Sequence, residues 1–375
     1  MGRACELLEH AARVAPADSI TLHHLGRARE AAGDASGALA ADEAAVRADP
    51  DQAVARLHYA NGLERAGERD KSLLHFNRAL KDAQRAGQWR DAESTPPALR
   101  PLVEHAVITV RKGRRATFDS LLSPLKQRYG GAALGRVESA IRIYVGEQDP
   151  RYPDARQQPT FFYVPGLPTT PYFDRRLFAW IPAYEAMYPA ILEELQALLP
   201  TDQGRERVFG SDALEEANLK GYGRAPSWNG YYFYRHGERR EVNCTACPIT
   251  ARILDSISLT RIREHGPEVL YSVFTPGTHL LPHRGVTNAR AVSHLPLIVP
   301  SDCAINVGGE VHQWRTGRVV VFDDTYEHEA WNRSNEIRVV LIADVWNPHL
   351  TDVEQAALGD VIATIGDLRA EMDNG

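Results

Sequence analysis

Short apolar segments fill the part of the chain between residues 269 and 346, and turn-forming residues separate each from the next. The segments read VLYSVF, SHLPLIV, CAINV, RVVVF and IRVVLIADVW. Short strands at such even spacing, with no helix-length segment between them, favour an antiparallel double sheet over a βαβ fold. We therefore expect a double-stranded β-helix, or jelly roll, in the C-terminal half.

The N-terminal half contains an internal repeat with a period of 34 residues. Small and apolar residues recur at this spacing: Leu25-Gly26, Gly33, Ala38 and Ala45 correspond to Tyr59-Ala60, Gly67, Ser72 and Ala79. The pattern resembles the tetratricopeptide repeat, in which small residues let paired helices approach closely. A generic alanine-rich pair of helical hairpins is the alternative.

A proline-rich stretch at 148–173 interrupts the helical pattern and marks the predicted domain boundary. We predict a tetratricopeptide-like helical repeat domain at 1–150, a jelly-roll domain at 158–350 and a C-terminal helix at 351–375. Two large domains also suit a chain of 375 residues. The predicted fold class is therefore α+β, with a helical repeat region followed by a jelly roll.

The amino-acid composition limits which partners the protein is expected to bind and in which compartment it is expected to occur. A formal net charge of -6 gives no basic footprint for nucleic acid. No apolar run approaches the roughly 18 residues of a membrane span, and the four cysteines are too few for a disulfide framework. We expect a cytoplasmic protein with no nucleic-acid partner and no membrane span.

Three polar residues stand out in the strand-rich part: His283, His328 and Arg338. Two neutral imidazoles suit iron, zinc, copper or nickel. The usual oxygenase triad adds a carboxylate two residues after the first histidine, where this chain has Gly285. Arg338 lies within an apolar strand, where a guanidinium is costly unless it meets an anion. Its fork suits the distal carboxylate of 2-oxoglutarate.

The text PGTHLLPHRGVTNARAVSHLPLIVP, FDDTYEHEAWN and IRVVLIADVWNP resembles the aspartyl/asparaginyl β-hydroxylase family of Fe(II)- and 2-oxoglutarate-dependent oxygenases. The helical repeat region before it also resembles the arrangement in animal members. The resemblance implies a dioxygenase that uses molecular oxygen to hydroxylate Cβ of an aspartyl or asparaginyl residue, or of a related small acid. The substrate would be a peptide, a protein or a small acidic molecule.

The resemblance also implies roles for individual residues. The iron ligands fall on His283 and His328, and Gly285 agrees with the family. The 2-oxoglutarate contacts fall on Arg338, Ser272 and His294. Arg290 falls on a substrate-binding arginine, but Val292 stands where the family has a second one. A site with one guanidinium fewer would either prefer a different acidic partner or recruit Arg284 or a residue of 224–240.

Three other functions are also compatible with the sequence. A halogenase, a hydroxylase of lipid or free amino acids, and a non-catalytic interaction protein built on the repeats are the alternatives. Further polar and aromatic residues are expected to have structural roles: Cys244 and Cys247 in a turn with free thiols, Asp323 and Asp324 at a turn and strand end, and Trp331 in packing.

Overall fold

The computed structural model describes residues 2–201, 203–221 and 226–373. The chain forms two compact units. One contains the helices up to Asp119 together with the last residues from Leu368, and the other comprises Ser120–Asp367. The three domains predicted at 1–150, 158–350 and 351–375 stay a prediction. No helix within the described ranges combines the length and the apolar character that crossing a bilayer requires.

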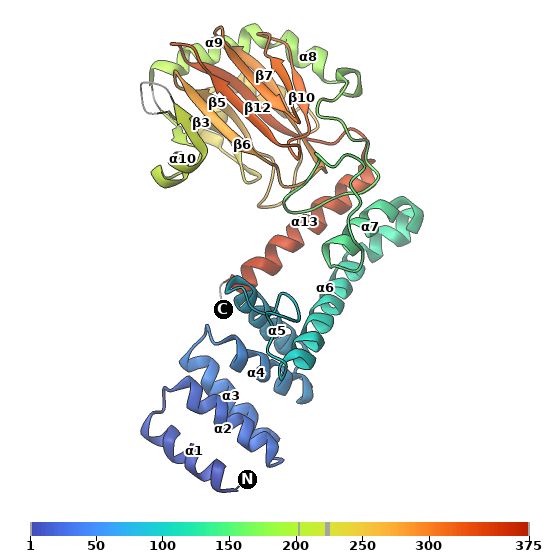
Figure 1. The fold of residues 1–375 in the computed structure, drawn as a ribbon. Helices are drawn as coiled ribbons and strands as arrows, with labels where there is room; N and C mark the ends of the chain where they lie inside the picture. The colour runs from blue at the N-terminus through green and yellow to red at the C-terminus, as the bar shows by residue number, and fades with distance from the viewer. Residues whose placement is uncertain (1, 202, 222–225, 374–375) are drawn as a thin grey trace. The chain divides into compact units, whose positions relative to one another are not determined.

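The first unit is built from helices arranged in pairs (Figure 1). Its helices are α1 (Gly2–Val14), α2 (Ser19–Ala31), α3 (Ala35–Ala48), α4 (Ala53–Arg65), α5 (Arg69–Arg85) and the start of α6 (Arg100–Tyr129). Helix α2 packs on α3 and α4 packs on α5, which are the two pairs that the repeat predicts. Helical patterns at 98–112 and 116–130 predict two helices, but the structure has one, α6.

Equivalent residues of the repeat have equivalent roles. Gly33 and Gly67 follow α2 and α4 with φ of +85° and +86°, a left-handed backbone that glycine adopts without steric cost. Ala45 and Ala79 are fully buried, because only small side chains fit where the paired helices meet. These positions support a tetratricopeptide-like region, and its assignment to that family of repeats stays a proposal.

The second unit contains further helices in addition to its sheets. They are η1 (Gly131–Leu134), α7 (Gly135–Tyr144), η2 (Arg175–Leu177), α8 (Ile181–Ala186), α9 (Tyr188–Leu198), η3 (Leu199–Thr201), α10 (Asp212–Asn218), α11 (Glu241–Ala246), α12 (Pro248–Leu254) and α13 (Asp352–Asp373). Apolar residues at helical spacing over 177–199 predict a single helix, but the structure has two, α8 and α9. Pro189, at the start of α9, has no N–H to donate and so ends the preceding helix. The expected C-terminal helix is present as α13.

Twelve strands are found in the described residues, in two antiparallel sheets. The first sheet contains β1 (Arg205–Arg207), β3 (Trp228–Arg235), β5 (Val269–Phe274), β12 (Arg338–Trp346), β7 (Arg290–Ile298) and β10 (Val320–Phe322), in that order, with β4 (Glu238–Arg239) beside β3. The second contains β2 (Leu219–Gly221), β6 (Thr278–His283), β11 (His328–Asn332), β8 (Cys303–Val307) and β9 (Glu310–Gln313). Each of the five apolar segments of the sequence supplies most or all of one strand: β5, β7, β8, β10 or β12.

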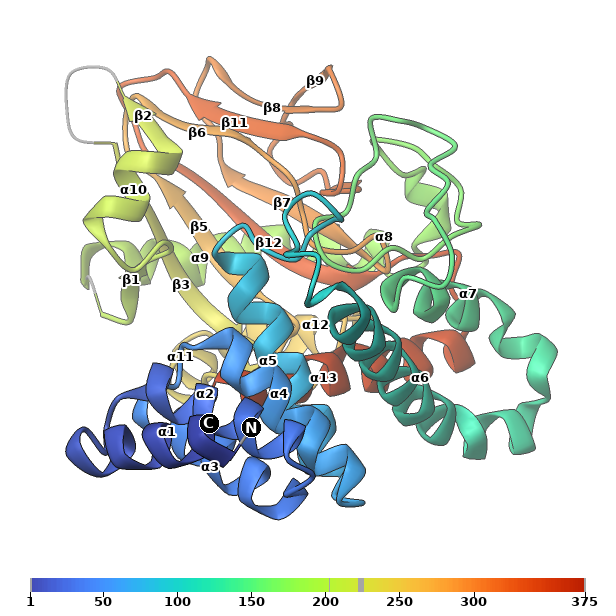
Figure 2. The same ribbon diagram turned by 60° about the horizontal axis from the view of Figure 1, so that its bottom comes forward.

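The first sheet separates two apolar cores. Alternate residues of β12, such as Val339 and Leu341, belong to a core that also contains residues of α8, α9, α11 and α12. Figure 1 shows α8 and α9 beside this sheet. Val340, which points the other way, joins a core shared with the second sheet. Figure 2 shows β6, β11 and β8 of that second sheet apart from β5, β12 and β7. The architecture is α+β. Polar side chains on the inner face of the first sheet point towards the second sheet and are shielded from solvent.

Candidate functional site

The two predicted metal ligands lie side by side. Antiparallel pairing of β6 with β11 places His328 directly opposite His283. Directly paired residues point to the same face of a sheet, and the centres of the two imidazole rings are 4.1 Å apart. Residues 45 positions apart in the sequence therefore form a pair.

Hydrogen bonds assign the protons of both rings. His283 Nδ1 donates to the carbonyl oxygen of Leu281 at 2.8 Å, and His328 Nδ1 donates to that of Tyr326 at 3.1 Å. Each Nε2 therefore keeps a lone pair, which is the form that binds a metal. Burial, with the neighbouring His283, lowers the pKa of His328 to about 4. This imidazole is neutral at physiological pH.

A carboxylate occupies the space next to Gly285. A Cβ placed at Gly285 would lie 2.1 Å from Cγ of Asp324 and 2.2 and 2.3 Å from its two carboxylate oxygens. The backbone adds a bond, from Gly285 N to Asp324 O at 2.6 Å. Asp324 is buried, and its Oδ1 has no hydrogen-bond partner. Asp324 lies in a turn, as expected. Its carboxylate occupies the space that the side chain of an acidic triad residue at position 285 would need.

The donor set is two imidazoles with a carboxylate nearby. Across the described part of the chain, no cluster of three or more His, Cys, Asp or Glu side chains has the geometry of a metal site. A two-histidine site leaves positions for other ligands, and the nearby Asp324 Oδ1 is ready to accept a hydrogen bond from one of them. The chemistry of this set fits a divalent transition metal such as iron.

Arg338 is buried without a counter-ion. It is 2% exposed, and Nη1 donates to the carbonyl oxygen of Ser272 at 3.2 Å and to its hydroxyl at 3.1 Å. Its guanidinium carbon lies 3.7 Å from the centre of the Phe274 ring. Among the described residues no carboxylate pairs with Arg338, and its Nε has no partner. Burial lowers the pKa of Arg338 to about 9, so the group is still charged at neutral pH. Such a site fits an anion.

Ser272 and His294 lie on the same inner face as Arg338. Ser272 is opposite Val340 on β12, and its Oγ accepts from Trp228 Nε1 at 2.9 Å as well as from Arg338. Two donors to one hydroxyl oxygen leave its own O–H available to donate to a ligand. His294 is 5% exposed, and its Nδ1 has no partner. Burial, then the nearby Arg338 and His328, lowers its pKa well below the ordinary value.

Arg290, the predicted substrate contact, is engaged by two carboxylates. Its Nη2 lies 2.9 Å from Asp324 Oδ2 and its Nη1 lies 2.5 Å from Asp344 Oδ2. Burial disfavours the charge of Arg290, but Asp344 and Asp324 outweigh that effect and raise the pKa. A substrate carboxylate would compete with these partners. Arg290 therefore also holds Asp324 in position.

The turn that carries Asp324 is fixed by its neighbour Asp323. The Asp323 carboxylate, 1% exposed, accepts from Thr325 N at 2.9 Å, from Thr325 Oγ1 at 2.5 Å and from Gln157 Nε2 at 2.5 Å. Burial raises the pKa of Asp323 to about 6. The segment around Gln157, far away in the sequence, thus ties this turn to the rest of the unit.

A pocket of about 400 Å³ opens beside His328. Its polar lining includes Arg156, Arg284, Asn306, Glu327 and Glu329. Arg284 donates to the carbonyl oxygen of Arg156 at 2.6 Å and lies 3.7 Å from a Glu327 oxygen. Arg284 is therefore placed near the predicted metal ligand His328. Residues 224 and 225, part of the other expected source of a cation, lie outside the described residues.

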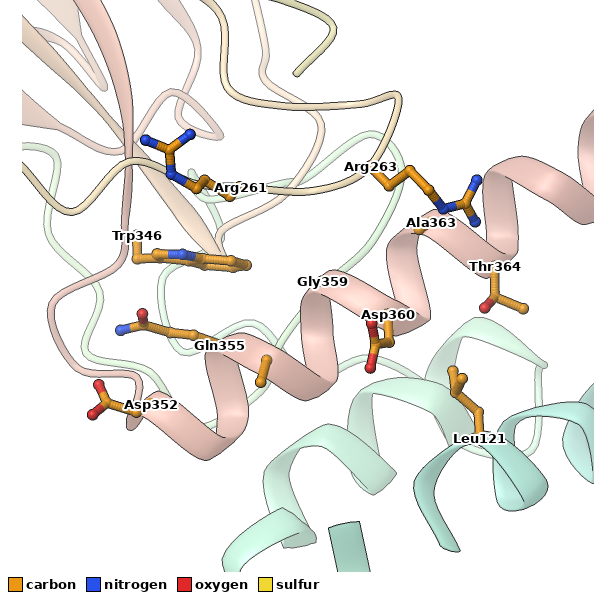
Figure 3. A pocket seen from close by; sticks show the side chains of 11 residues that line it. Leu121, Arg261, Arg263, Trp346, Asp352, Gln355, Gly359, Asp360, Ala363 and Thr364 are labelled. Carbon is orange, nitrogen blue, oxygen red and sulfur yellow. The ribbon is translucent and has the colours of Figure 1, made fainter. Parts of the chain in front are cut away.

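Figure 3 shows a different pocket, of about 600 Å³, against α13. Arg261, Trp346, Gln355 and Asp360 are among the residues that line it. Arg263 at its edge is paired with Asp367, with Nη2 2.5 Å from Oδ2. The pocket has the volume of a ligand site, but Arg261 and Arg263 are exposed, whereas Arg338 is buried.

Four residues near the site were not predicted as functional: Asp324, Trp228, Trp314 and Phe274. They come from different strands and loops, and no spacing in the sequence marks them. Cys244 and Cys247 are buried free thiols, as expected. Cys244 lies within helix α11 rather than in a turn, and Cys247 lies between α11 and α12.

Comparison with known proteins gives consistent results. Residues 185–348 match the sequence profile of the family described as Aspartyl/Asparaginyl beta-hydroxylase. Aspartate beta-hydroxylase domain-containing protein 2 of Mus musculus is 31% identical over 267 residues, which are 69% of this chain and 74% of that protein. Aspartyl/asparaginyl beta-hydroxylase of Mus musculus is 32% identical over 207 residues, 54% of this chain and 26% of that protein.

A bacterial protein is also similar. Ornithine lipid ester-linked acyl 2-hydroxylase of Rhizobium tropici is 34% identical over 186 residues, 48% of this chain and 62% of that protein. The match to the human form of domain-containing protein 2 spans 64% of its length. The chain therefore corresponds to only part of several of these relatives.

Proposed function

Because the chain belongs to the aspartyl/asparaginyl β-hydroxylase family, we propose that it is a hydroxylase dependent on Fe(II) and 2-oxoglutarate. The observation that carries the proposal is Arg338, a buried guanidinium without a carboxylate partner in the described residues. It lies on the inner face of the sheet whose neighbour carries the His283–His328 pair. The two antiparallel sheets would form the jelly roll expected from the sequence.

Different residues would bind the iron and the 2-oxoglutarate. His283 and His328 would bind iron through Nε2, and Arg338, Ser272 and His294 would bind 2-oxoglutarate. When bound, iron supplies the oxidative decarboxylation of 2-oxoglutarate to succinate and carbon dioxide, and the transfer of one oxygen atom from O₂ to a C–H bond of the substrate. The protein supplies position and a dry environment.

The chain's own residues perform the binding steps. Arg338 pairs with the distal carboxylate, and Ser272 donates its hydroxyl proton to the same group. The lowered pKa of His294 leaves its imidazole uncharged at neutral pH, so it acts as a neutral hydrogen-bonding partner. Asp324 Oδ1 accepts a hydrogen bond from water or another ligand held beside the histidines. Arg290 keeps the Asp324 carboxylate in place.

The leading substrate is an aspartyl or asparaginyl residue, hydroxylated at Cβ, or a related small acid. The tetratricopeptide-like helices would present a peptide or protein chain, since such arrays commonly bind extended segments. Arg290 and Arg284 are the proposed contacts for an acidic group. The cytoplasmic location expected from the sequence stays part of this proposal.

A second candidate is the hydroxylation of a neutral acyl group. One relative carries the name ornithine lipid ester-linked acyl 2-hydroxylase. Arg290 is already neutralised by Asp324 and Asp344, and Val292 provides an apolar side chain next to it on the same face. These contacts favour an uncharged substrate group at this position.

Two alternatives are less well supported. A halogenase needs room for halide where the triad carboxylate is missing, but the carboxylate of Asp324 lies against Gly285 and would repel an anion. A non-catalytic interaction protein gives no reason to bury Arg338 without a counter-ion, which costs stability unless an anion binds.

The test is succinate formation by the full chain with Fe(II), 2-oxoglutarate and O₂. Candidate substrates are peptides containing Asp or Asn, the free amino acids and an ester-linked acyl lipid, and the product is identified by a mass gain of one oxygen. We expect His328→Ala to abolish succinate formation, whereas His10→Ala, a change at an exposed position of α1, should leave it unchanged. Native activity in His328→Ala would refute the proposal.

A further inference from the structure

We propose that Trp314 is a 2-oxoglutarate-binding residue, whose indole N–H donates to the distal carboxylate that pairs with Arg338. The inference rests on the proposed function and deepens it. Trp314 is 6% exposed, and its Nε1 has no hydrogen-bond partner among the described residues. A buried indole N–H usually finds an acceptor. The absence of an acceptor for Trp314 Nε1 in the described residues indicates that a ligand provides one.

The position of Trp314 supports this role. It follows β9 and belongs to the apolar core between the two sheets. The centre of its ring lies 4.9 Å from the guanidinium carbon of Arg338 and 5.8 Å from the centre of the His294 ring. Trp314 therefore contacts the region between two of the residues that are expected to hold 2-oxoglutarate.

The aromatic contacts of Arg338 define where an anion can bind. The guanidinium carbon lies close to the rings of Phe274, at 3.7 Å, and of Trp314, at 4.9 Å. Neither ring provides an acceptor for Arg338 Nε, which has no hydrogen-bond partner, so this N–H is left for a carboxylate. The indole N–H is also on the edge of its ring. An anion at the edge of Arg338 can therefore accept from both groups.

Counting donors leads to the same conclusion. Arg338 Nε and Trp314 Nε1 have no acceptor, and the hydroxyl of Ser272 already accepts two hydrogen bonds and donates none within the described residues. Together these groups provide three buried donors and one positive charge. A carboxylate has about four lone-pair sites and one negative charge, so it can satisfy all three donors. A water molecule could accept only some of these bonds and would leave the charge uncompensated.

The experiment compares two ligands on the Mn(II)-loaded protein by calorimetry. 2-Oxoglutarate has the distal carboxylate, and 2-oxopentanoate has a methyl group in its place. Trp314→Phe keeps an aromatic ring beside Arg338 and removes the N–H. The control is Trp331→Phe, since Trp331 lies on β11 beside His279 and Arg333 and not beside Arg338.

We expect Trp314→Phe to weaken the binding of 2-oxoglutarate by about tenfold, the size of one hydrogen bond to a charged group. Binding of 2-oxopentanoate should change by less than about twofold, because it offers no acceptor. Trp331→Phe should leave both affinities unchanged. Trp314→His, which retains a ring N–H, should recover part of the preference for 2-oxoglutarate and serves as the second variant if Trp314→Phe does not fold.

The outcomes separate this inference from the proposed function. Equal weakening of both ligands in Trp314→Phe, or unchanged binding of both, would overturn the role of Trp314, because neither depends on the distal carboxylate. Failure of the proposed function has a different signature. In that case the native protein would not prefer 2-oxoglutarate to 2-oxopentanoate, and Arg338→Met would bind both ligands as the native protein does.

Discussion

At the scale of single residues, the site depends on which polar atoms lack partners. Arg338 Nε, His294 Nδ1, Trp314 Nε1 and Asp324 Oδ1 are all buried and unsatisfied in the described structure. Native proteins leave few such atoms without a reason. Arg338, His294 and Trp314 lie near one another, which indicates a place where a ligand completes the hydrogen bonding.

The contact between Gly285 and Asp324 gives the first prediction. Gly285→Ala should displace the Asp324 carboxylate, because the new Cβ would lie 2.1 Å from its Cγ. We expect roughly tenfold weaker binding of Mn(II), the usual effect of disturbing a group next to metal ligands. Calorimetric titration measures this, with Gly131→Ala as the control, since a Cβ at Gly131 meets nothing within 4 Å. Native affinity in Gly285→Ala would show that Asp324 has no influence on the metal.

The buried carboxyl of Asp323 gives a second prediction, on pH. Its pKa is raised from 3.8 to about 6, so the folded state favours the protonated form. This contribution to stability is present in full below about pH 4 and is lost as the pH rises through 6. In Asp323→Asn the loss should be absent.

Urea unfolding of the native protein and of Asp323→Asn at several pH values measures this effect. The difference in the free energy of unfolding between them should shift in favour of the variant by up to about 3 kcal/mol between about pH 4 and pH 7. A difference that is constant with pH would mean that Asp323 titrates normally.

At the scale of elements, local patterns predict most strands and helices but not their pairing. The apolar segments became β5, β7, β8, β10 and β12 because short buried strands are readable from their composition. The division of the helix at Pro189 was missed, although proline gives a local reason for it. The opposition of His283 and His328 depends on long-range register, which no local pattern contains.

Repeat glycines allow a prediction on the helical region. Gly33 and Gly67 have φ of +85° and +86°, a conformation that costs other residues about 1 kcal/mol. Gly33→Ala and Gly67→Ala should each lower the free energy of unfolding by about 1 kcal/mol, and thermal or urea unfolding measures it. Gly135, with φ of −57°, is the control position. A cost at Gly135→Ala equal to that at the repeat glycines would contradict the argument.

At the scale of the whole molecule, the sequence predicts the α+β class and brings Ser272, His283, His294, His328 and Arg338 to one two-sheet unit. These residues could be predicted because the strand pattern and the family resemblance each identify individual positions in the sequence. Asp324, Trp228 and Trp314 could not, because their roles arise only from proximity in space. Arg290 stays a predicted substrate contact, now with the additional role of holding Asp324.

Ligand binding should stabilise the folded chain through Arg338. A ligand at about 100 times its Kd adds about 2.7 kcal/mol to the free energy of unfolding, so 2-oxoglutarate with Mn(II) should raise the Tm of the native protein above that with Mn(II) alone. Arg338→Met should lose this increase, whereas Arg333→Met, at an exposed position, should keep it. An undiminished increase in Arg338→Met would place the 2-oxoglutarate site elsewhere.

The most direct measurement is the fate of oxygen atoms from ¹⁸O₂ during turnover with Fe(II) and 2-oxoglutarate. Decarboxylation of 2-oxoglutarate by this route places one atom of O₂ in succinate, even when the substrate is not the natural one. We predict that mass spectrometry will find succinate that carries a single ¹⁸O atom, and that His328→Ala will form none. Absence of succinate from the native protein, or succinate without label, would contradict the assignment of this chain as a 2-oxoglutarate-dependent oxygenase.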